Sequence, residues 1–304
     1  MNRSSSQLWA AGALMVLALI WSYNWVLMKI AIRYASPFDF AAMRAFYGAL
    51  SLFLVLFIQG RSLRLPMVPG LVWYGILQSG ATVGLSTWAL VSGGAGKTAI
   101  LTYTMSFWTV LFAWVFLGET LRLRQWISLG FAAVGLGFIL MPLTLTDELL
   151  SKGLAILAGV TWAMASTVLR QLRLKEPLDP IVFTAWQMLF GSVPLILVSL
   201  WLPSSPVQWS VEFLWILGYN AIPASAIAWL LWFYALKHLS TDTASLGALL
   251  TPVLSIPIAA LHLGEIPSPT ELLGIGLILL ALVLKTPIEG VFYRFKPQKT
   301  NRMR

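Results

Sequence analysis

Long apolar runs separated by short polar links make up most of this chain. A bilayer core takes about 20 apolar residues of helix, and the runs are continuous rather than alternating, which favours helices over strands. We therefore predict an all-α membrane protein with ten transmembrane helices. The ten runs cover residues 8–31, 39–59, 67–91, 96–117, 124–142, 152–171, 180–202, 212–236, 242–263 and 270–286.

One stretch of this pattern occurs twice. Residues 98–130 and 244–276 superpose with a constant shift of 146, and in each copy an apolar run ends in a Gly-Glu pair. Such self-similarity indicates a duplication. It predicts two five-helix repeats, 1–146 and 147–286, followed by a basic cytoplasmic tail, 287–304. Further pairs support it at slightly different shifts: Trp21 with Trp162, Phe40 with Phe183, and Gly48 with Gly191.

The number of helices in each repeat decides how the repeats are oriented. Because five is odd, the second repeat must begin on the opposite face of the membrane from the first. The repeats are therefore predicted to be inverted, with a pseudo-two-fold axis in the membrane plane. Secondary transporters often use this plan, since two related halves can rock around a site at their interface.

Composition and charge agree with a membrane location. The chain is 59% hydrophobic and 10% charged, with a mean hydropathy of +0.82, whereas a soluble domain carries about 25% charged residues. The net charge of +9 does not indicate nucleic acid, because the basic residues lie in short loops and the tail, where they set orientation. We expect a bacterial inner-membrane protein with both termini in the cytoplasm. The inner loops then hold Arg61, Arg64, Arg122, Arg124, Arg170, Arg173, Lys175 and Lys237, and the outer loops hold Arg33, Lys97 and Lys152.

Enzyme chemistry finds little support in the residues. The chain has no cysteine, which excludes thiolate nucleophiles and cysteine-bound metals. Residues 93–98, GGAGKT, resemble a phosphate loop, but Val91 stands where its first glycine is needed, so we interpret them as a glycine-rich turn. His238 and His262 are predicted on opposite faces and cannot form one metal site. We expect no catalytic residue, no metal and no cofactor.

Polar and aromatic residues inside the runs are the best candidates for a binding site. A buried amide is costly in lipid unless it is hydrogen-bonded or faces a wet cavity, and aromatic rings offer stacking faces to a solute. For any single tryptophan among the fifteen present, an interfacial belt is the alternative. The candidates are Trp21, Asn24, Gln78, Thr82, Tyr103, Trp162, Ser166, Trp229 and Ser245.

Charged residues and prolines in the runs suggest structural or gating roles. Arg44 lies inside the second run and Lys29 near the end of the first. Ionisable residues in a membrane indicate function; the alternatives are that Lys29 snorkels to the interface and that Arg44 pairs with Asp39 or loop carbonyls. Without a mid-span carboxylate, transport down a gradient is the simpler hypothesis. Glu119 and Glu265 at run ends can cap or pair with basic loops, and Pro252 can kink the ninth run.

Three phrases in the sequence resemble a known family. LFAWVFLGETLRLRQ, FYALKHLSTDTASLGALLTPVLSIPIAALHLGE and LLGIGLILLALVL are similar to the EamA-type repeat of the drug/metabolite transporter superfamily, over about residues 8–286. Ser106 stands where the second copy has Pro252, which argues against a kink in the fourth run that matches the ninth.

Within that superfamily the chain resembles the aromatic amino acid exporters of the YddG type. Trp21, Tyr103 and Trp162 match positions that line the central cavity of that group, while Thr82 and Met105 replace two of its aromatic residues. The resemblance implies a cavity between the halves, lined by the first, third, fourth, sixth, eighth and ninth helices, with the fifth and tenth more peripheral.

The expected function is export of amino acids, aromatic or other neutral ones, and related small metabolites by alternating access. Rings would stack on the substrate, and Asn24, Gln78, Thr82 and Ser245 would hydrogen-bond its amino and carboxylate groups. The alternative on the same fold is export of a cationic drug, a nucleoside or a sugar phosphate. A membrane enzyme or scaffold would need a catalytic constellation or a long soluble loop. The expected partners are a small-molecule substrate and the lipid bilayer, with the chain as a monomer.

Overall fold

The computed structural model describes residues 3–66, 70–141, 147–173, 179–239 and 247–285, and these contain helices and no strand. The predicted all-helical fold is confirmed. In chain order the elements are α1 (Arg3–Ala31), α2 (Pro37–Ile58), α3 (Leu71–Gly75), η1 (Ile76–Ala81), α4 (Thr82–Ala89), α5 (Ala95–Tyr103), α6 (Met105–Leu117), α7 (Leu123–Leu140), α8 (Asp147–Arg173), α9 (Pro180–Trp201), α10 (Val211–Ala221), η2 (Ile222–Ile227), α11 (Ala228–His238), α13 (Leu250–Leu263) and α14 (Pro269–Lys285).

Seven helical segments in the described residues are long and apolar enough to cross a bilayer. They correspond to the first, second and fourth to eighth predicted runs. The ninth and tenth runs form shorter apolar helices, Leu250–Leu263 and Pro269–Leu284. The third run forms the segment α3–η1–α4, in which two α-helices flank a π-helix.

The two Gly-Glu pairs end α6 and α13 with the same local geometry. Gly118 and Gly264 have φ of 68° and 69°, a left-handed conformation that glycine adopts without the strain of a Cβ. The next N–H groups, those of Glu119 and Glu265, donate back to the carbonyls of Ala113 at 3.2 Å and Ala259 at 3.4 Å. This is a helix C-cap in which glycine permits the turn and the following residue satisfies a terminal carbonyl.

A π-helix interrupts the third run and another interrupts the eighth, at positions related by the shift of 146: η1 begins at Ile76 and η2 at Ile222. A hydroxyl donates to a carbonyl five residues earlier at both places: Thr82, just after η1, to Leu77 at 2.8 Å, and Ser225, within η2, to Asn220 at 2.7 Å. Neither π segment was predicted from the run pattern. π segments are rare and often occur at functional sites.

The fourth run is also interrupted, contrary to the expectation from Ser106. Helix α5 ends at Tyr103 and α6 begins at Met105, with Thr104 between them. The Thr104 hydroxyl donates to the Leu101 carbonyl at 2.6 Å, which supplies a local alternative to the helical ladder without a proline. Helix α13 begins at Leu250, the position to which the shift of 146 takes Thr104. The interruptions in the two repeats therefore lie within a residue or two of equivalent positions.

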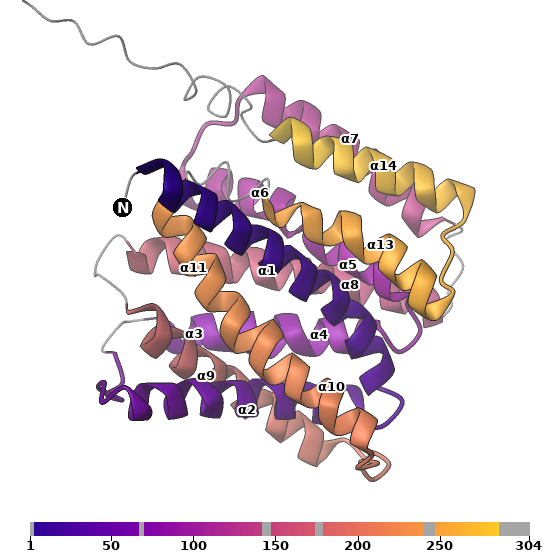
Figure 1. The fold of residues 1–304 in the computed structure, drawn as a ribbon. Coiled ribbons are helices and arrows are strands. Elements are labelled where there is room, and N and C mark those ends of the chain that lie inside the picture. The colour runs from indigo at the N-terminus through magenta and orange to yellow at the C-terminus, as the bar shows by residue number, and fades with distance from the viewer. Residues whose placement is uncertain (1–2, 67–69, 142–146, 174–178, 240–246, 286–304) are drawn as a thin grey trace, which may run out of the picture.

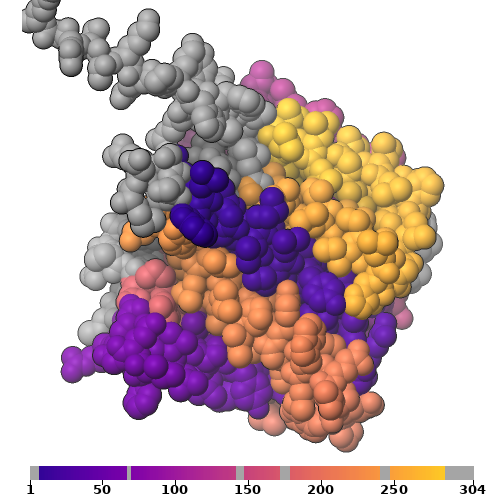
Figure 2. Space-filling model, viewed as in Figure 1, coloured from indigo at the N-terminus to yellow at the C-terminus, as the bar shows by residue number. Residues whose placement is uncertain are grey.

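Helices at equivalent positions of the repeats pair closely at the periphery. Helix α2 packs along α9, and α7 packs along α14 as a separate layer at the top of Figure 1. Gly135 and Gly274 let α7 and α14 approach so closely that a Cβ on either would lie under 3 Å from the other's carbonyl. Between these pairs, α1 contacts both α11 and α13, and Figure 2 shows indigo α1 running between the orange and yellow segments. The two repeats therefore interlock through the centre of the molecule.

Candidate functional site

A cavity lies among helices of both repeats. Its empty volume is about 720 Å³, including space open to solvent. The lining comes from α1, α2, η1, α4, α5, α8, α9, η2 and α11, and α7 and α14 contribute nothing to it. The lining residues are Trp21, Asn24, Trp25, Met28, Arg44, Ala45, Gln78, Ser79, Thr82, Val83, Ser86, Thr102, Tyr103, Trp162, Met188, Ala224, Ser225 and Trp229.

Most of the residues singled out from sequence meet in this cavity. They are Trp21, Asn24, Arg44, Gln78, Thr82, Tyr103, Trp162 and Trp229. Ser166 is not part of the lining, and its hydroxyl donates to the Trp162 carbonyl of its own helix at 2.9 Å. Pro252 is buried in the first turn of α13 and is not part of the lining. Ser245 lies outside the described residues.

An aromatic cluster forms one wall. The Trp21 ring meets the rings of Trp162 and Trp229 edge to face, with centroids 6.3 and 5.9 Å apart. Tyr103 meets Trp162 in the same way at 5.5 Å. The Trp21 indole donates to the Ala224 carbonyl at 3.0 Å, so η2 holds this ring. An edge-to-face pair covers one face of a ring, and the other face can pack against a flat solute.

Polar groups form another part of the lining. The Asn24 amide donates to the Met28 sulfur at 3.1 Å, and its buried carbonyl oxygen has no partner among the described residues. Gln78 and Thr82 are each only 5% exposed, and the Thr82 hydroxyl lies 3.0 Å from that of Thr161 on α8. A buried acceptor without a donor is costly, so the cavity is suited to a ligand that supplies one.

Arg44 brings a positive charge to the cavity and is only 7% exposed. Its guanidinium donates to the Met28 sulfur and to the Ser225 hydroxyl, each at 3.1 Å. Pairing with Asp39, the alternative considered from sequence, does not occur. The Asp39 carboxylate instead accepts hydrogen bonds from Ser199 and Ser204.

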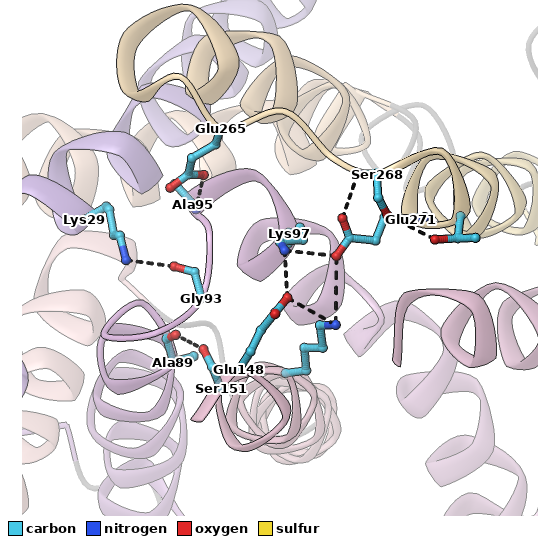
Figure 3. Close-up of polar contacts among 12 residues, drawn as sticks. Lys29, Ala89, Gly93, Ala95, Lys97, Glu148, Ser151, Glu265, Ser268 and Glu271 are labelled. Carbon is cyan, nitrogen blue, oxygen red and sulfur yellow. Dashed lines mark hydrogen bonds and ion pairs between the residues drawn. The ribbon is translucent and has the colours of Figure 1, made fainter. Parts of the chain in front are cut away.

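A second polar cluster surrounds the link between α4 and α5 (Figure 3). The Lys29 ammonium donates to the carbonyls of Leu90 at 2.5 Å and Gly93 at 3.0 Å. The Glu265 carboxylate accepts from the Ala95 N–H at 2.6 Å. The Lys29 ammonium thus ends on the α4–α5 link. Lys29 on α1 and Glu265 just after α13 therefore carry opposite charges and both bind the link between α4 and α5.

Ion pairs extend this cluster across three helices. Lys97 on α5 lies 2.9 Å from both Glu148 on α8 and Glu271 on α14. Lys152 adds a contact to Glu148 at 3.2 Å. Residues 93–98 thus form a turn and the start of α5, bound by side chains from other helices, which fits a glycine-rich turn.

The other end of the α5–α6 segment carries a different ion pair. Glu119, just after α6, pairs with Arg170 on α8, and the two side chains are 43% and 55% exposed. Glu265 binds at Ala95, where the 23-residue segment Ala95–Leu117 begins. The two equivalent glutamates therefore lie at opposite ends of one membrane-length segment, α5–α6.

Sequence reasoning missed several lining residues, among them Met28, Ser79 and Ser225. Met28 was one apolar residue among many in its run. Ser79 and Ser225 did carry a signal, because the shift of 146 superposes them and both now lie in π-helices. Small hydroxyl residues in membrane helices usually serve packing, which is why they did not stand out.

Comparisons with known proteins identify a family and several relatives. Residues 8–141 and 151–286 each match the EamA-like transporter family. The chain is 29% identical over 274 residues to YoaV, an uncharacterized transporter of Bacillus subtilis, covering 88% of this chain and 93% of that one. It is 24% identical over 289 residues to YedA, an uncharacterized inner membrane transporter of Escherichia coli, covering 90% of each.

Two further similarities concern a named transporter and the fold. The chain is 22% identical over 302 residues to a Salmonella typhimurium protein named as a probable amino-acid metabolite efflux pump, covering 95% and 96% of the two chains. A crystal structure with 21% identity superposes with a TM-score of 0.63 and covers 94% and 98%, which shows a shared fold. With one family repeat in each half, the chain belongs to the EamA-like transporter family and is a multi-pass membrane protein.

Proposed function

We propose that this transporter crosses the bacterial inner membrane ten times, as two inverted repeats with both termini in the cytoplasm. Seven long apolar segments, two shorter ones and the α3–η1–α4 segment supply ten candidates. The positions of Glu119 and Glu265 support inversion, because equivalent residues of parallel repeats would lie at the same end of α5–α6 rather than at opposite ends.

We further propose that it exports amino acids, aromatic or other neutral ones, by alternating access. The observation that carries this proposal is the lining of the central cavity, which contains tryptophan rings, buried amides and one guanidinium. Rings suit an apolar side chain, and the polar groups suit the charged end of an amino acid. The proposed solute contacts are those of Trp21, Tyr103, Trp162 and Trp229, with Asn24, Gln78 and Thr82.

The two glutamates provide a mechanism for alternating which end is closed. The shift of 141 that superposes Trp21 on Trp162 takes Lys29 to Arg170, and the shift of 146 takes Glu119 to Glu265. Glu265 and Lys29 are therefore the counterparts of the pair Glu119–Arg170. In this conformation the first pair is formed, while Lys29 and Glu265 bind the α4–α5 link instead. We propose that the outer pair, Lys29 with Glu265, forms when the inner pair, Glu119 with Arg170, breaks.

Reversing one charge of the inner pair tests this gating proposal. In Arg170→Glu, repulsion from Glu119 should favour opening on the cytoplasmic side. An exposed pair contributes only about 0.5 kcal/mol, so a cysteine placed at Ser79 should react about twofold faster with a thiol reagent added from that side. Restoring the pair in Glu119→Arg/Arg170→Glu should return the rate to that of the parent. Equal rates in all three would refute the proposed role.

Flux measurements with purified protein in proteoliposomes test the function itself. The panel contains radiolabelled aromatic, small neutral and cationic amino acids, with a lipophilic cation, a nucleoside and a sugar phosphate as alternatives. We expect neutral amino acids to equilibrate fastest, without accumulation under an imposed pH gradient, because no mid-span carboxylate is available to carry a proton. Uphill accumulation driven by protons would overturn the facilitator mechanism. Flux of only the alternative solutes would overturn the amino acid assignment.

A further inference from the structure

Arg44 contributes a buried positive charge that no carboxylate neutralises in the part of the chain that the structure describes. Its two hydrogen-bond acceptors are a thioether and a hydroxyl, both uncharged. Burying a cation without an anion is costly, and the fixed fork of guanidinium N–H groups matches a carboxylate better than either neighbour. We infer that Arg44 binds the carboxylate of the transported solute. This inference rests on the proposed function and names the chemical group that the cavity requires.

The neighbours of Arg44 complete a site for a zwitterion. The guanidinium of Arg44 and the amide of Asn24 both donate to the Met28 sulfur, each at 3.1 Å. The two side chains are therefore adjacent, with one sulfur atom between them. Asn24 also has a buried carbonyl oxygen without a donor. A solute with a carboxylate beside an ammonium group matches this pair, because each protein group lacks the partner that the solute supplies.

Two features of the fold set Arg44 in this place. Helix α2 carries it to the cavity, and η2 presents Ser225 to it. Pro223, at the start of η2, has no N–H to donate to the helical ladder, and the Ser225 hydroxyl donates to the Asn220 carbonyl in the last turn of α10. The Ser225 hydroxyl donates its proton to Asn220, so its oxygen can accept a hydrogen bond from Arg44. This bond orients the guanidinium.

Among the described residues that line the cavity, Arg44 is the one cation. The shift of 143 that superposes Phe40 on Phe183 and Gly48 on Gly191 takes Arg44 to Gln187, a fully buried neutral amide. Lys29 is bound to backbone carbonyls elsewhere and is not part of the lining. One guanidinium suits a monoanionic carboxylate. A phosphate group, with more charge, would call for a cluster of cations.

Three related probes separate the groups of the solute: phenylalanine, phenylalanine amide, which lacks the carboxylate, and 3-phenylpropionate, which lacks the ammonium. In wild-type proteoliposomes, phenylalanine should compete for labelled amino acid at least about tenfold more strongly than its amide. In Arg44→Met, the KM for the amino acid should rise at least about tenfold, and the preference for the free acid over the amide should largely vanish. Arg44→Lys should retain part of it. Arg33→Met, which removes an exposed arginine of the α1–α2 link, should retain all of it.

Thermal unfolding in detergent supplies a readout that does not depend on transport. Because the guanidinium lacks an anion, Arg44→Met should not lower the Tm of the ligand-free protein, and 3-phenylpropionate should raise the Tm of the wild type but not of the variant. If wild type moves no amino acid but shows this pattern, the proposed function fails and the role of Arg44 stands. An unchanged preference for acid over amide in Arg44→Met, equal stabilisation of both proteins, or a large loss of ligand-free stability would each overturn the inference.

Discussion

Replacing Gly191 with alanine is expected to destabilise the folded protein by about 3 kcal/mol, because overpacking costs this much where the neighbours cannot move. A Cβ at this position would lie 2.4 Å from the Ser79 Cβ, 2.5 Å from the Gly75 carbonyl and 2.8 Å from the Gly80 nitrogen. Two of these atoms are backbone, so no change of rotamer relieves the contact. The variant should melt at least about 5 °C lower in detergent and yield less monodisperse protein.

The effect should extend to the cavity, because the displaced segment is η1, which carries Gln78 and Ser79. Gly218→Ala is the matched control: Gly218 lies inside α10, and a Cβ there meets nothing within 4 Å. That variant should keep the parent's Tm and flux. If Gly191→Ala were as stable as Gly218→Ala, the close backbone contact between α9 and η1 would not exist in the protein.

Removing the Trp162 ring is expected to lower amino acid flux by about tenfold or more, equivalent to about 1.4 kcal/mol in the barrier. Trp162 is the ring that joins Trp21 on α1 to Tyr103 on α5. Its loss in Trp162→Ala removes a stacking face and loosens both neighbours. Trp162→Phe keeps a face and should recover most of the flux. The measurement is the initial rate in proteoliposomes at equal protein incorporation.

The matched control is a tryptophan with similar ring geometry outside the cavity. Trp126 on α7 meets Trp114 edge to face at 5.5 Å and is 47% exposed. Trp126→Ala loses an equivalent aromatic pair, so its flux should remain within about twofold of the parent if ring contact outside the pathway is unimportant. Equal losses in Trp126→Ala and Trp162→Ala would mean that the effect comes from stability, and the proposed stacking wall would be wrong.

Much of the fold was predictable, because membrane helices give strong local signals. Apolar length located the helical segments, and the Gly-Glu pairs marked the duplication because each ends a helix with a left-handed glycine. The mid-run candidates Trp21, Asn24 and Tyr103 also proved to share a cavity. Their polar or aromatic character in an apolar run is a property of the residue itself, so it can be read without a structure.

Other features depended on tertiary contacts and could not be read in this way. The interruption at Thr104 rests on one hydroxyl, and a threonine in an apolar run has many other uses. For Arg44, sequence proximity pointed to Asp39, whereas the actual partner, Ser225, is 181 residues away. Only the three-dimensional pairing of α2 with the second repeat reveals that the guanidinium lacks an anion.

Alternating access requires that the cavity between the repeats opens to each face of the membrane in turn. Since the chain has no cysteine, a single cysteine at Ser79, on the cavity lining, can report access directly. We predict that membrane-impermeant thiol reagents label Ser79→Cys from either side in oriented vesicles, and that a transported amino acid slows labelling from both. Labelling from one side only, or from neither side with or without the amino acid, would contradict the account.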